Sequence, residues 1–295
     1  MPINFAVIPV AGQGTRLLPL TKSQPKEMLP VGRKPIVQHV VEELTHSGIS
    51  KICLVTGPGK QSIENHFDVD EELIQMLRKN GREELLETLD FERKAIEYFY
   101  TRQRRQLGLG HAILSARSLV NDQSFVVALG DSIIGLHVKS RIVAQLVEQF
   151  EKKEADAAIA FEEVPPQDVV KYGIAEPRDD KMAVFELEGI VEKPSQEEAT
   201  SNLAIAARYV FSPIIFDFLA ETKPGINGEI QLTDAIQALI QKGGKVIGLK
   251  LNEGEERFDI GNPLSYFRAF VDFALADPEY GEALSKWAKS RFDNS

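Results

Sequence analysis

Cysteine is nearly absent from this 295-residue sequence, and the one residue present, Cys53, can form neither an internal disulfide nor a cysteine metal cluster. Cys53 lies in the apolar run KICLVTG, which favours a small buried side chain over a nucleophile. Long apolar runs are also missing, since none approaches the ~20 residues of a membrane helix. The apolar stretch near the N-terminus has no basic segment before it and is interrupted at Gly12, unlike a signal peptide. We therefore expect a cytoplasmic protein that does not contact a membrane.

An excess of positive charge is missing as well. The chain has 34 Lys and Arg against 44 Asp and Glu, which gives a net charge of −10. A general nucleic-acid binder needs a basic face to displace counterions from phosphates, so this class of protein is excluded. A local basic pocket for a small anion stays open. The sequence also lacks repeats, Ser/Gly linkers and low-complexity tracts, and we predict a single domain over residues 1–295.

The first half of the chain alternates between strand and helix patterns. Residues 5–10 form an apolar run that ends in glycines, as expected of a strand buried on both faces. Residues 35–48 have apolar positions at helical spacing, and residues 51–57 form a second buried strand. This order implies a right-handed crossover and a parallel sheet. Further strands are predicted at 96–103 and 124–131.

The rest of the chain is more varied. Residues 60–93 are highly charged and are predicted to form an exposed helical excursion. The second half is richer in short strands, and helices are predicted again at 229–243 and in the C-terminal segments 264–276 and 279–291. The fold class that follows is α/β: a Rossmann-like α/β/α sandwich with a mixed, mainly parallel central sheet.

The first strand runs into the loop AGQGTR. Gly12 and Gly14 fit a G-x-G pattern, but Leu17 occupies the place of a third glycine and no G-K-[ST] follows, so neither the dinucleotide fingerprint nor Walker A is met. Two glycines still let backbone N–H groups approach a phosphate, and Arg16 adds charged donors. A tight turn with a solvated Arg16 explains the loop alone about as well.

The continuation of this loop favours a binding site. Pro19, Pro25 and Pro30 break any helix, so residues 17–30 are predicted to be an extended loop. A long loop in a compact domain is usually a binding loop or disordered, and the apolar residues here argue against disorder. Lys26 is then held beside the carboxyl edge of the sheet, where α/β proteins bind ligands.

The pattern G-x-G-T-R-L-x-P-x-T followed by P-K-E-M-L-P-V resembles the signature of the sugar nucleotidyltransferases. The P-K-E-M-L-P form is most similar to the bacterial UTP–glucose-1-phosphate uridylyltransferases, whereas thymidylyltransferase relatives more often carry S-K-Q-L-L-P. Five further blocks follow in the family's order over nearly the whole chain: RQRRQLGLGHAI, VVALGDSII, YGIAEP, GIVEKP and NLAIAARYVF…GEIQLTDA…RFDIGN. Together they make a specific signal.

This resemblance implies an enzyme that makes UDP-glucose and pyrophosphate from UTP and glucose 1-phosphate with Mg²⁺. The nucleotide-binding part spans about residues 1–135, and the sugar-binding and oligomerisation part about 136–295. Family members commonly form homodimers or homotetramers. Chemistry of this kind depends on positioning and charge neutralisation more than on a covalent intermediate.

The resemblance also assigns the nucleotide end of the site. Arg16 and Lys26 are implied to stabilise the charge of the leaving pyrophosphate, and Gln103 to read the base edge through its amide donor and acceptor. The implied nucleotide-binding positions are Ala11, Gly12, Gly14, Thr15, Glu27, Gln103 and Gly108. Relatives have fewer charges between their R-Q and L-G-L-G, and Arg104 and Arg105 here are expected to be solvated.

For the sugar end, Lys193 is implied to pair with the phosphate of glucose 1-phosphate, and Glu192 to accept from sugar hydroxyls. Gly173 and Asn202 complete this set. By composition alone, GIVEKP fits an exposed turn with an ion pair.

Asp131 and Asp259 are implied to bind Mg²⁺, a cation that prefers oxygen ligands. Relatives usually carry a second acid directly after the first of these aspartates. This chain has Ser132 in that place.

Two alternatives remain at this point. A thymidylyl- or cytidylyltransferase would keep the chemistry and change the base. A catalytically silent relative would bind a nucleotide sugar and regulate, but it would be expected to lose Arg16, Lys26, Asp131 or Lys193, and all four are present. A dinucleotide-dependent oxidoreductase is disfavoured by the missing third glycine.

Overall fold

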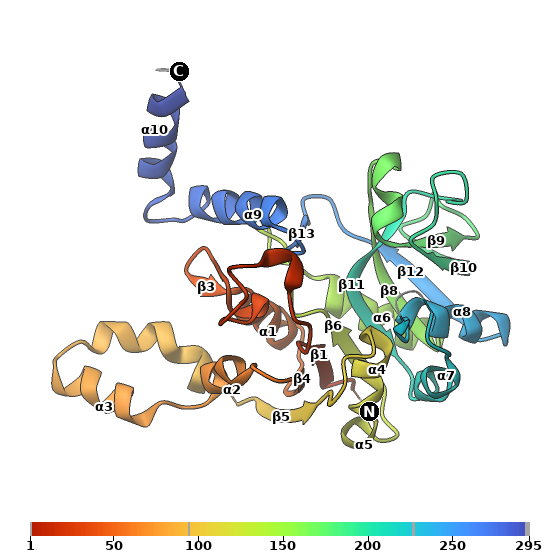
Figure 1. Cartoon of the computed structure of the whole chain (residues 1–295), viewed down its shortest axis with the longest axis horizontal. Helices are drawn as coiled ribbons and strands as arrows, with labels where there is room; N and C mark the ends of the chain where they lie inside the picture. The colour runs from red at the N-terminus through yellow and green to blue at the C-terminus, as the bar shows by residue number, and fades with distance from the viewer. Residues whose placement is uncertain (1, 94, 226–227, 293–295) are drawn as a thin grey trace.

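The computed structural model describes residues 2–93, 95–225 and 228–292. Its centre is a nine-stranded sheet with the order β5-β4-β1-β6-β11-β8-β12-β10-β9 (Figure 1). These strands are β1 (Phe5–Pro9), β4 (Lys51–Thr56), β5 (Glu97–Arg102), β6 (Phe125–Ala128), β8 (Ala157–Glu163), β9 (Gly173–Pro177), β10 (Val184–Glu192), β11 (Leu203–Phe211) and β12 (Val246–Lys250).

The sheet is mixed and mainly parallel, as predicted. The pairs β1–β4, β4–β5, β1–β6 and β8–β12 are parallel, while β11 and β10 are antiparallel to their neighbours. Two strands therefore run against the other seven. The apolar runs predicted as the first two strands form β1 and β4, and Cys53 is fully buried in β4.

Helices cover both faces of the sheet and give it three layers. One apolar cluster joins the sheet to α1 (Ile36–His46) and α6 (Ile142–Lys153). The other joins it to α4 (Leu109–Leu114), α7 (Ile215–Glu221) and α8 (Leu232–Gln241). A second short helix, α5 (Arg117–Val120), follows α4 closely.

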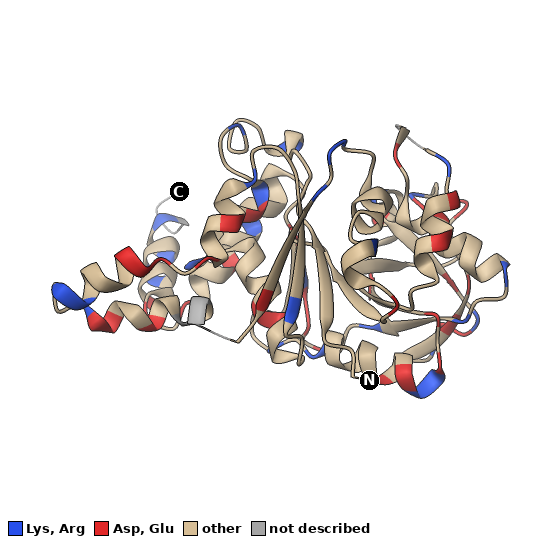
Figure 2. Cartoon of the chain, turned by 90° about the horizontal axis from the view of Figure 1, so that it is seen from below, with Lys and Arg blue, Asp and Glu red and all other residues tan. Residues whose placement is uncertain are grey.

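Two groups of helices project from this body in Figure 1. The charged segment after β4 is helical, as predicted. It forms α2 (Gln61–Phe67), α3 (Glu71–Lys79) and a run of 3₁₀ turns at Glu83–Arg93. At the other end, α9 (Pro263–Leu275) and α10 (Gly281–Phe292) close the chain. Charges of both signs are interspersed over helices and loops in Figure 2. Within the described residues, no helix has the length and apolar character needed to span a bilayer.

The loop over residues 17–30 differs from the prediction of a purely extended segment. Two 3₁₀ turns, Thr15–Leu17 and Lys26–Met28, fold it back on itself. The prolines prevent a long helix, but they do not prevent single turns that need only one local hydrogen bond each. The loop leads into a small hairpin of β2 (Pro30–Val31) and β3 (Lys34–Pro35).

Candidate active site

A cavity of about 670 Å³ opens beside the sheet, next to the segment that follows β6. Its wall includes a small two-stranded antiparallel sheet, in which β7 (Ser132–Ile134) pairs with β13 (Arg257–Asp259). Six of the sequence-predicted site residues line this cavity: Arg16, Asp131, Gly173, Glu192, Lys193 and Asp259. The structure thus brings both predicted metal-binding residues and three of the four predicted sugar-binding residues to one cavity.

Charges of both signs meet at the cavity wall, where Asp131 lines the cavity and Lys26 lies outside its lining. Lys26 forms an ion pair with Asp131. Burial lowers the pKa of the Lys26 ammonium, but the nearby carboxylates, Asp131 first, outweigh it and the net pKa is raised. Burial raises the pKa of Asp131, yet Lys26 outweighs this and the net pKa is lowered. Both groups are therefore charged at neutral pH, with Arg16 adding a second nearby cation.

Asp259 lies near enough to Asp131 and Lys26 for both charges to act on its carboxyl group. Burial raises the pKa of its carboxyl group, and the negative charge of Asp131 raises it further. Two carboxylates that repel each other suit a divalent cation, which would relieve the repulsion. Among the residues that the structure describes, no group of three His, Cys, Asp or Glu side chains is placed to hold a metal. A cation at Asp131 and Asp259 would therefore need further oxygen ligands, such as phosphate or water oxygens.

The glycine loop packs against the stem of Lys26. A Cβ at Gly12 would lie 3.7 Å from Lys26 Cε, and Gly14 has a φ of +66°, which favours glycine. The Thr21 hydroxyl donates to the Gly14 carbonyl oxygen at 2.8 Å and closes the loop. Thr15 begins the first 3₁₀ turn and is exposed. The bare backbone expected near a phosphate therefore lies beside a cation.

Glu27 occupies a different environment from its neighbour. It is 1% exposed, and its carboxylate accepts from Lys60 Nζ at 2.7 Å in a pair that is buried on both sides. Burial raises the pKa of Glu27 against the opposing effect of Lys60. This geometry anchors the loop to the segment after β4 and leaves Glu27 out of the cavity lining. No sequence pattern indicates Lys60 as the partner of Glu27.

Gln103 lies at the end of β5 and is buried. Its amide donates to the Gly108 carbonyl oxygen at 2.9 Å and contacts His111 Nδ1 at 3.1 Å. Gln106 Nε2 donates to the Ala11 carbonyl oxygen at 2.8 Å, which joins this loop to the glycine loop. The predicted base-reading residues therefore form one unit beside the predicted phosphate loop, outside the cavity lining.

The GIVEKP block also lines the cavity, through Glu192 and Lys193. Thr233 Oγ1 donates to Glu192 Oε2 at 2.7 Å, so the GEIQLTDA block holds Glu192 in place. Lys193 has a φ of +47°, a strained conformation for a side chain of this size, and half of its side chain is exposed. A Cβ at Gly173 would lie 2.6 Å from Ile205 Cδ1, so a larger residue there would require the Ile205 side chain to shift. Asn202 is exposed and lies outside the cavity lining.

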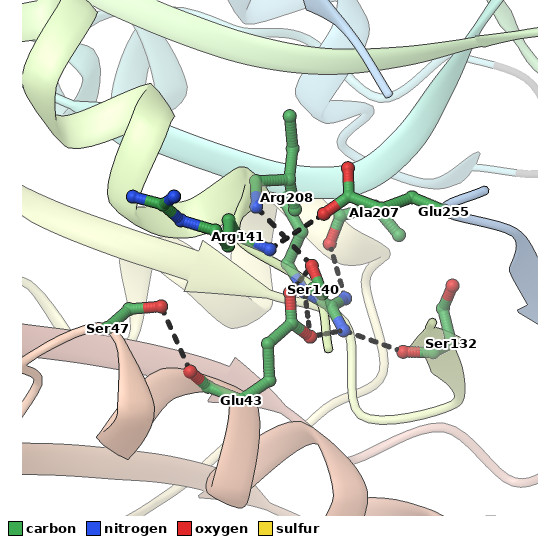
Figure 3. Close-up of polar contacts among 9 residues, drawn as sticks. Glu43, Ser47, Ser132, Ser140, Arg141, Ala207, Arg208 and Glu255 are labelled. Atoms are coloured by element: carbon green, nitrogen blue, oxygen red, sulfur yellow. Dashed lines mark hydrogen bonds and ion pairs between the residues drawn. The ribbon is translucent and has the colours of Figure 1, made fainter. Parts of the chain in front are cut away.

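The sequence did not reveal two further ion pairs next to the cavity. Arg257 is paired with Glu162, and its guanidinium stacks on the Tyr172 ring at 4.6 Å. Arg208, which lies within an apolar strand, is fully buried and donates to Glu43 Oε2 at 2.6 and 3.1 Å (Figure 3). Neither pair has a sequence signal, because each joins strands or helices that are distant along the chain.

The Arg208 guanidinium also supports the cavity wall. It donates to the carbonyl oxygens of Ala207 at 3.0 Å and Ser132 at 2.9 Å (Figure 3). Ala207 has a φ of +60°, at the point where the pairing register of β11 shifts. The Ser140 hydroxyl donates to the other Glu43 oxygen at 3.1 Å. This buried network fixes the backbone directly after Asp131.

Comparison with known proteins agrees with this geometry. The nucleotidyl transferase family model matches residues 5–275. A Methanocaldococcus jannaschii protein is 46% identical over 98% of this chain and 99% of its own length. The UTP–glucose-1-phosphate uridylyltransferase of Staphylococcus haemolyticus is 40% identical over 97% of this chain and 98% of its own.

Solved structures extend the likeness to three dimensions. A UTP-bound UDP-glucose pyrophosphorylase from Acinetobacter baumannii is 36% identical, with a TM-score of 0.89 over 97% of this chain and 98% of its own. A UDP-glucose pyrophosphorylase in complex with UDP-glucose is also 36% identical, with a TM-score of 0.81 over 91% of this chain and 97% of its own. The chain belongs to the nucleotidyl transferase family and is similar along nearly its whole length to the UTP–glucose-1-phosphate uridylyltransferases.

Proposed function

We propose that this protein transfers a uridylyl group between UTP and glucose 1-phosphate, giving UDP-glucose and pyrophosphate. The observation that carries the proposal is one cavity lined by two chemically different groups. Asp131, which is paired with Lys26, lines it together with Asp259, and Glu192 and Lys193 line it as well. The sequence similarity to uridylyltransferases supports the choice of substrates.

The reaction we propose is a direct displacement. A phosphate oxygen of glucose 1-phosphate attacks the α-phosphorus of UTP, the bond from that phosphorus to the bridging oxygen breaks, and pyrophosphate leaves. Arg16 and Lys26 neutralise the charge that develops on the leaving group. Lys26 suits this role because its raised pKa keeps it protonated, and because the loop packs around its stem.

Asp131 and Asp259 fit a bound Mg²⁺, which supplies positive charge to the phosphates when it is present. The carboxylate of Asp131 would then accept a hydrogen bond from Lys26 and would also help to hold the cation. Lys193 pairs with the sugar phosphate, and Glu192, held by Thr233, accepts from sugar hydroxyls.

Gln103 provides base selectivity in this proposal. Both hydrogens of its amide are directed to Gly108 and His111, so the oxygen is left as an acceptor. An acceptor matches the N3–H of uracil or thymine and mismatches the bare N3 of cytosine. This contact therefore argues against a cytidylyltransferase but does not separate uracil from thymine. A thymidylyltransferase stays as the second candidate, although a solved relative named for that activity is only 25% identical.

We also propose that the protein acts as a homodimer or homotetramer, through the exposed apolar side chains of α9 and α10. Its use of a nucleoside triphosphate is in keeping with the cytoplasmic location expected from the sequence.

The test is pyrophosphate release with glucose 1-phosphate and Mg²⁺, comparing UTP, dTTP, CTP and ATP. We expect UTP to be preferred and CTP to be poor. A dTTP preference would keep the mechanism and change the base, whereas binding of UTP without release in any mixture would favour the silent binder. Lys193→Ala should raise KM for glucose 1-phosphate roughly tenfold or more with KM for UTP little changed, because one charge-assisted contact is lost. Lys181→Ala, in an exposed turn, is the control.

A further inference from the structure

The hydroxyl of Ser132 has no hydrogen-bond partner although it is buried. Three side chains among the described residues share this property: Tyr98, Ser132 and Ser212. Of these, Ser132 alone lines the cavity. A buried hydroxyl without a partner costs about 1–3 kcal/mol, so its presence at the wall of a binding cavity points to a ligand.

The position of Ser132 indicates what kind of ligand this is. Ser132 directly follows Asp131, and it lies opposite Asp259 in the antiparallel β7–β13 pair. Residues opposite each other in such a pair have their side chains on the same face, with Cβ atoms roughly 5 Å apart. The Ser132 side chain is therefore on the same face as Asp259 and one residue along the chain from Asp131, and it adds a neutral oxygen to the two carboxylates that fit a cation.

The backbone at this position is fixed, but the hydroxyl can turn. Arg208 Nη2 holds the Ser132 carbonyl oxygen at 2.9 Å, and the Ile260 N–H donates to the Asp131 carbonyl oxygen at 3.0 Å. Rotation about χ1 moves the hydroxyl between three staggered positions while the main chain stays in place. The hydroxyl can thus leave its unpartnered orientation when a ligand arrives.

We propose that the Ser132 hydroxyl is a third oxygen ligand of the divalent cation at Asp131 and Asp259. This inference rests on the proposed function. A hydroxyl adds an oxygen without adding a third negative charge to two carboxylates that already repel each other. Serine hydroxyls bind Mg²⁺ in this way beside nucleotide phosphates in P-loop proteins. Phosphate and water oxygens fill the remaining positions.

The experiment compares Ser132→Ala with Ser212→Ala, a matched control whose hydroxyl is equally buried and unpartnered but lies outside the cavity lining. Mn²⁺ binding is measured by electron paramagnetic resonance with UTP present and glucose 1-phosphate left out, so that no turnover occurs. We expect Ser132→Ala to weaken Mn²⁺ binding roughly tenfold and Ser212→Ala to leave it unchanged. Neither variant should lower Tm in the presence of a chelator, because each removes an unpaired hydroxyl. Ser132→Thr, which keeps the hydroxyl, should bind Mn²⁺ like the parent.

Equal Mn²⁺ binding by Ser132→Ala and the parent would overturn the inference. So would weaker UTP binding by Ser132→Ala in the absence of any metal, since the hydroxyl would then contact the nucleotide. Pyrophosphate release by the parent is assayed separately. Release together with unchanged Mn²⁺ binding by Ser132→Ala would sink this inference and keep the proposed function. No pyrophosphate release by the parent, together with weakened Mn²⁺ binding by Ser132→Ala, would keep this inference and sink the proposed function.

Discussion

Asp131 and Asp259 are two residues of the same type with opposite electrostatic surroundings. The ion pair with Lys26 lowers the pKa of Asp131 despite burial, whereas burial and the charge of Asp131 raise the pKa of Asp259. A carboxyl group with a raised pKa binds its proton more tightly in the folded protein, so its ionisation opposes folding. A carboxyl group with a lowered pKa binds its proton less tightly in the folded protein, so its ionisation favours folding. The two aspartates should therefore respond oppositely to the same substitution.

Asp259→Asn is predicted to stabilise the metal-free protein at neutral pH. The gain should shrink as the pH falls toward the pKa of Asp259, which lies above its ordinary value of 3.8, because the parent then becomes protonated there too. Asp131→Asn should destabilise the protein at neutral pH, with a smaller loss as the pH falls through the lowered pKa of Asp131. The measurement is denaturant unfolding with a chelator at several pH values. The same sign for both variants would contradict this assignment of the charges.

At the residue scale, the sequence predicts most where a motif names the residue. Separate motifs of the resemblance assign Lys26 and Asp131 to one site, and the structure pairs these two side chains, while their predicted roles stay predictions. The sequence does not predict the partners of Glu27 and Arg208. Lys60 and Glu43 come close to them only once the loop and the sheet have formed. In the sequence, Arg208 is only a single charged residue within an apolar strand, and nothing there points to Glu43.

At the element scale, the connecting segments were harder to predict than the strands. The alternating pattern of the first half predicted β1, α1 and β4 closely, since buried parallel strands have a strong apolar signal. The 3₁₀ turns at Thr15–Leu17 and Lys26–Met28 were missed, because a single turn has too few residues to show a period. The turn after β5 is held from outside, by Ile230, whose N–H donates to the Leu107 carbonyl oxygen at 2.7 Å.

Gly108→Ala tests this turn. Gly108 has a φ of +94°, and a Cβ there would lie 2.8 Å from both Glu229 Cβ and the Ile230 carbonyl oxygen. We expect a loss of stability of about 2–4 kcal/mol from strain and overpacking together, and weaker UTP binding because the backbone shift moves the carbonyl oxygen that accepts from Gln103. Gly243→Ala is the control, with a φ of +85° and nothing within 4 Å of the added Cβ. Unfolding and UTP titration are measured for both variants, and an equal effect of the two would show that strain alone explains the loss.

At the scale of the whole molecule, α9 faces two ways. Its Ser265, Arg268 and Asp272 line the cavity, whereas Phe267 is 57% exposed and Val271 50% exposed. The exposed apolar surface continues onto α10, which projects from the body in Figure 1. The corner between the two helices is held to the β2–β3 turn by Arg33, whose guanidinium donates twice to Asp277 at 2.7 and 2.8 Å.

An exposed apolar surface on a projecting helix pair is typical of an interface, and it suits a second copy of the same chain. Phe267→Glu and Trp287→Glu should each convert the oligomer to a monomer, because a carboxylate buried between two copies has no partner. Met182→Glu, at a residue 57% exposed in the turn before β10, should leave the mass unchanged. Sedimentation velocity measures the mass of each variant. A parent that sediments as a monomer would contradict the assembly, and parent-like mass for both glutamate variants would move the interface elsewhere, with the exposed side of α3 as the next surface to test.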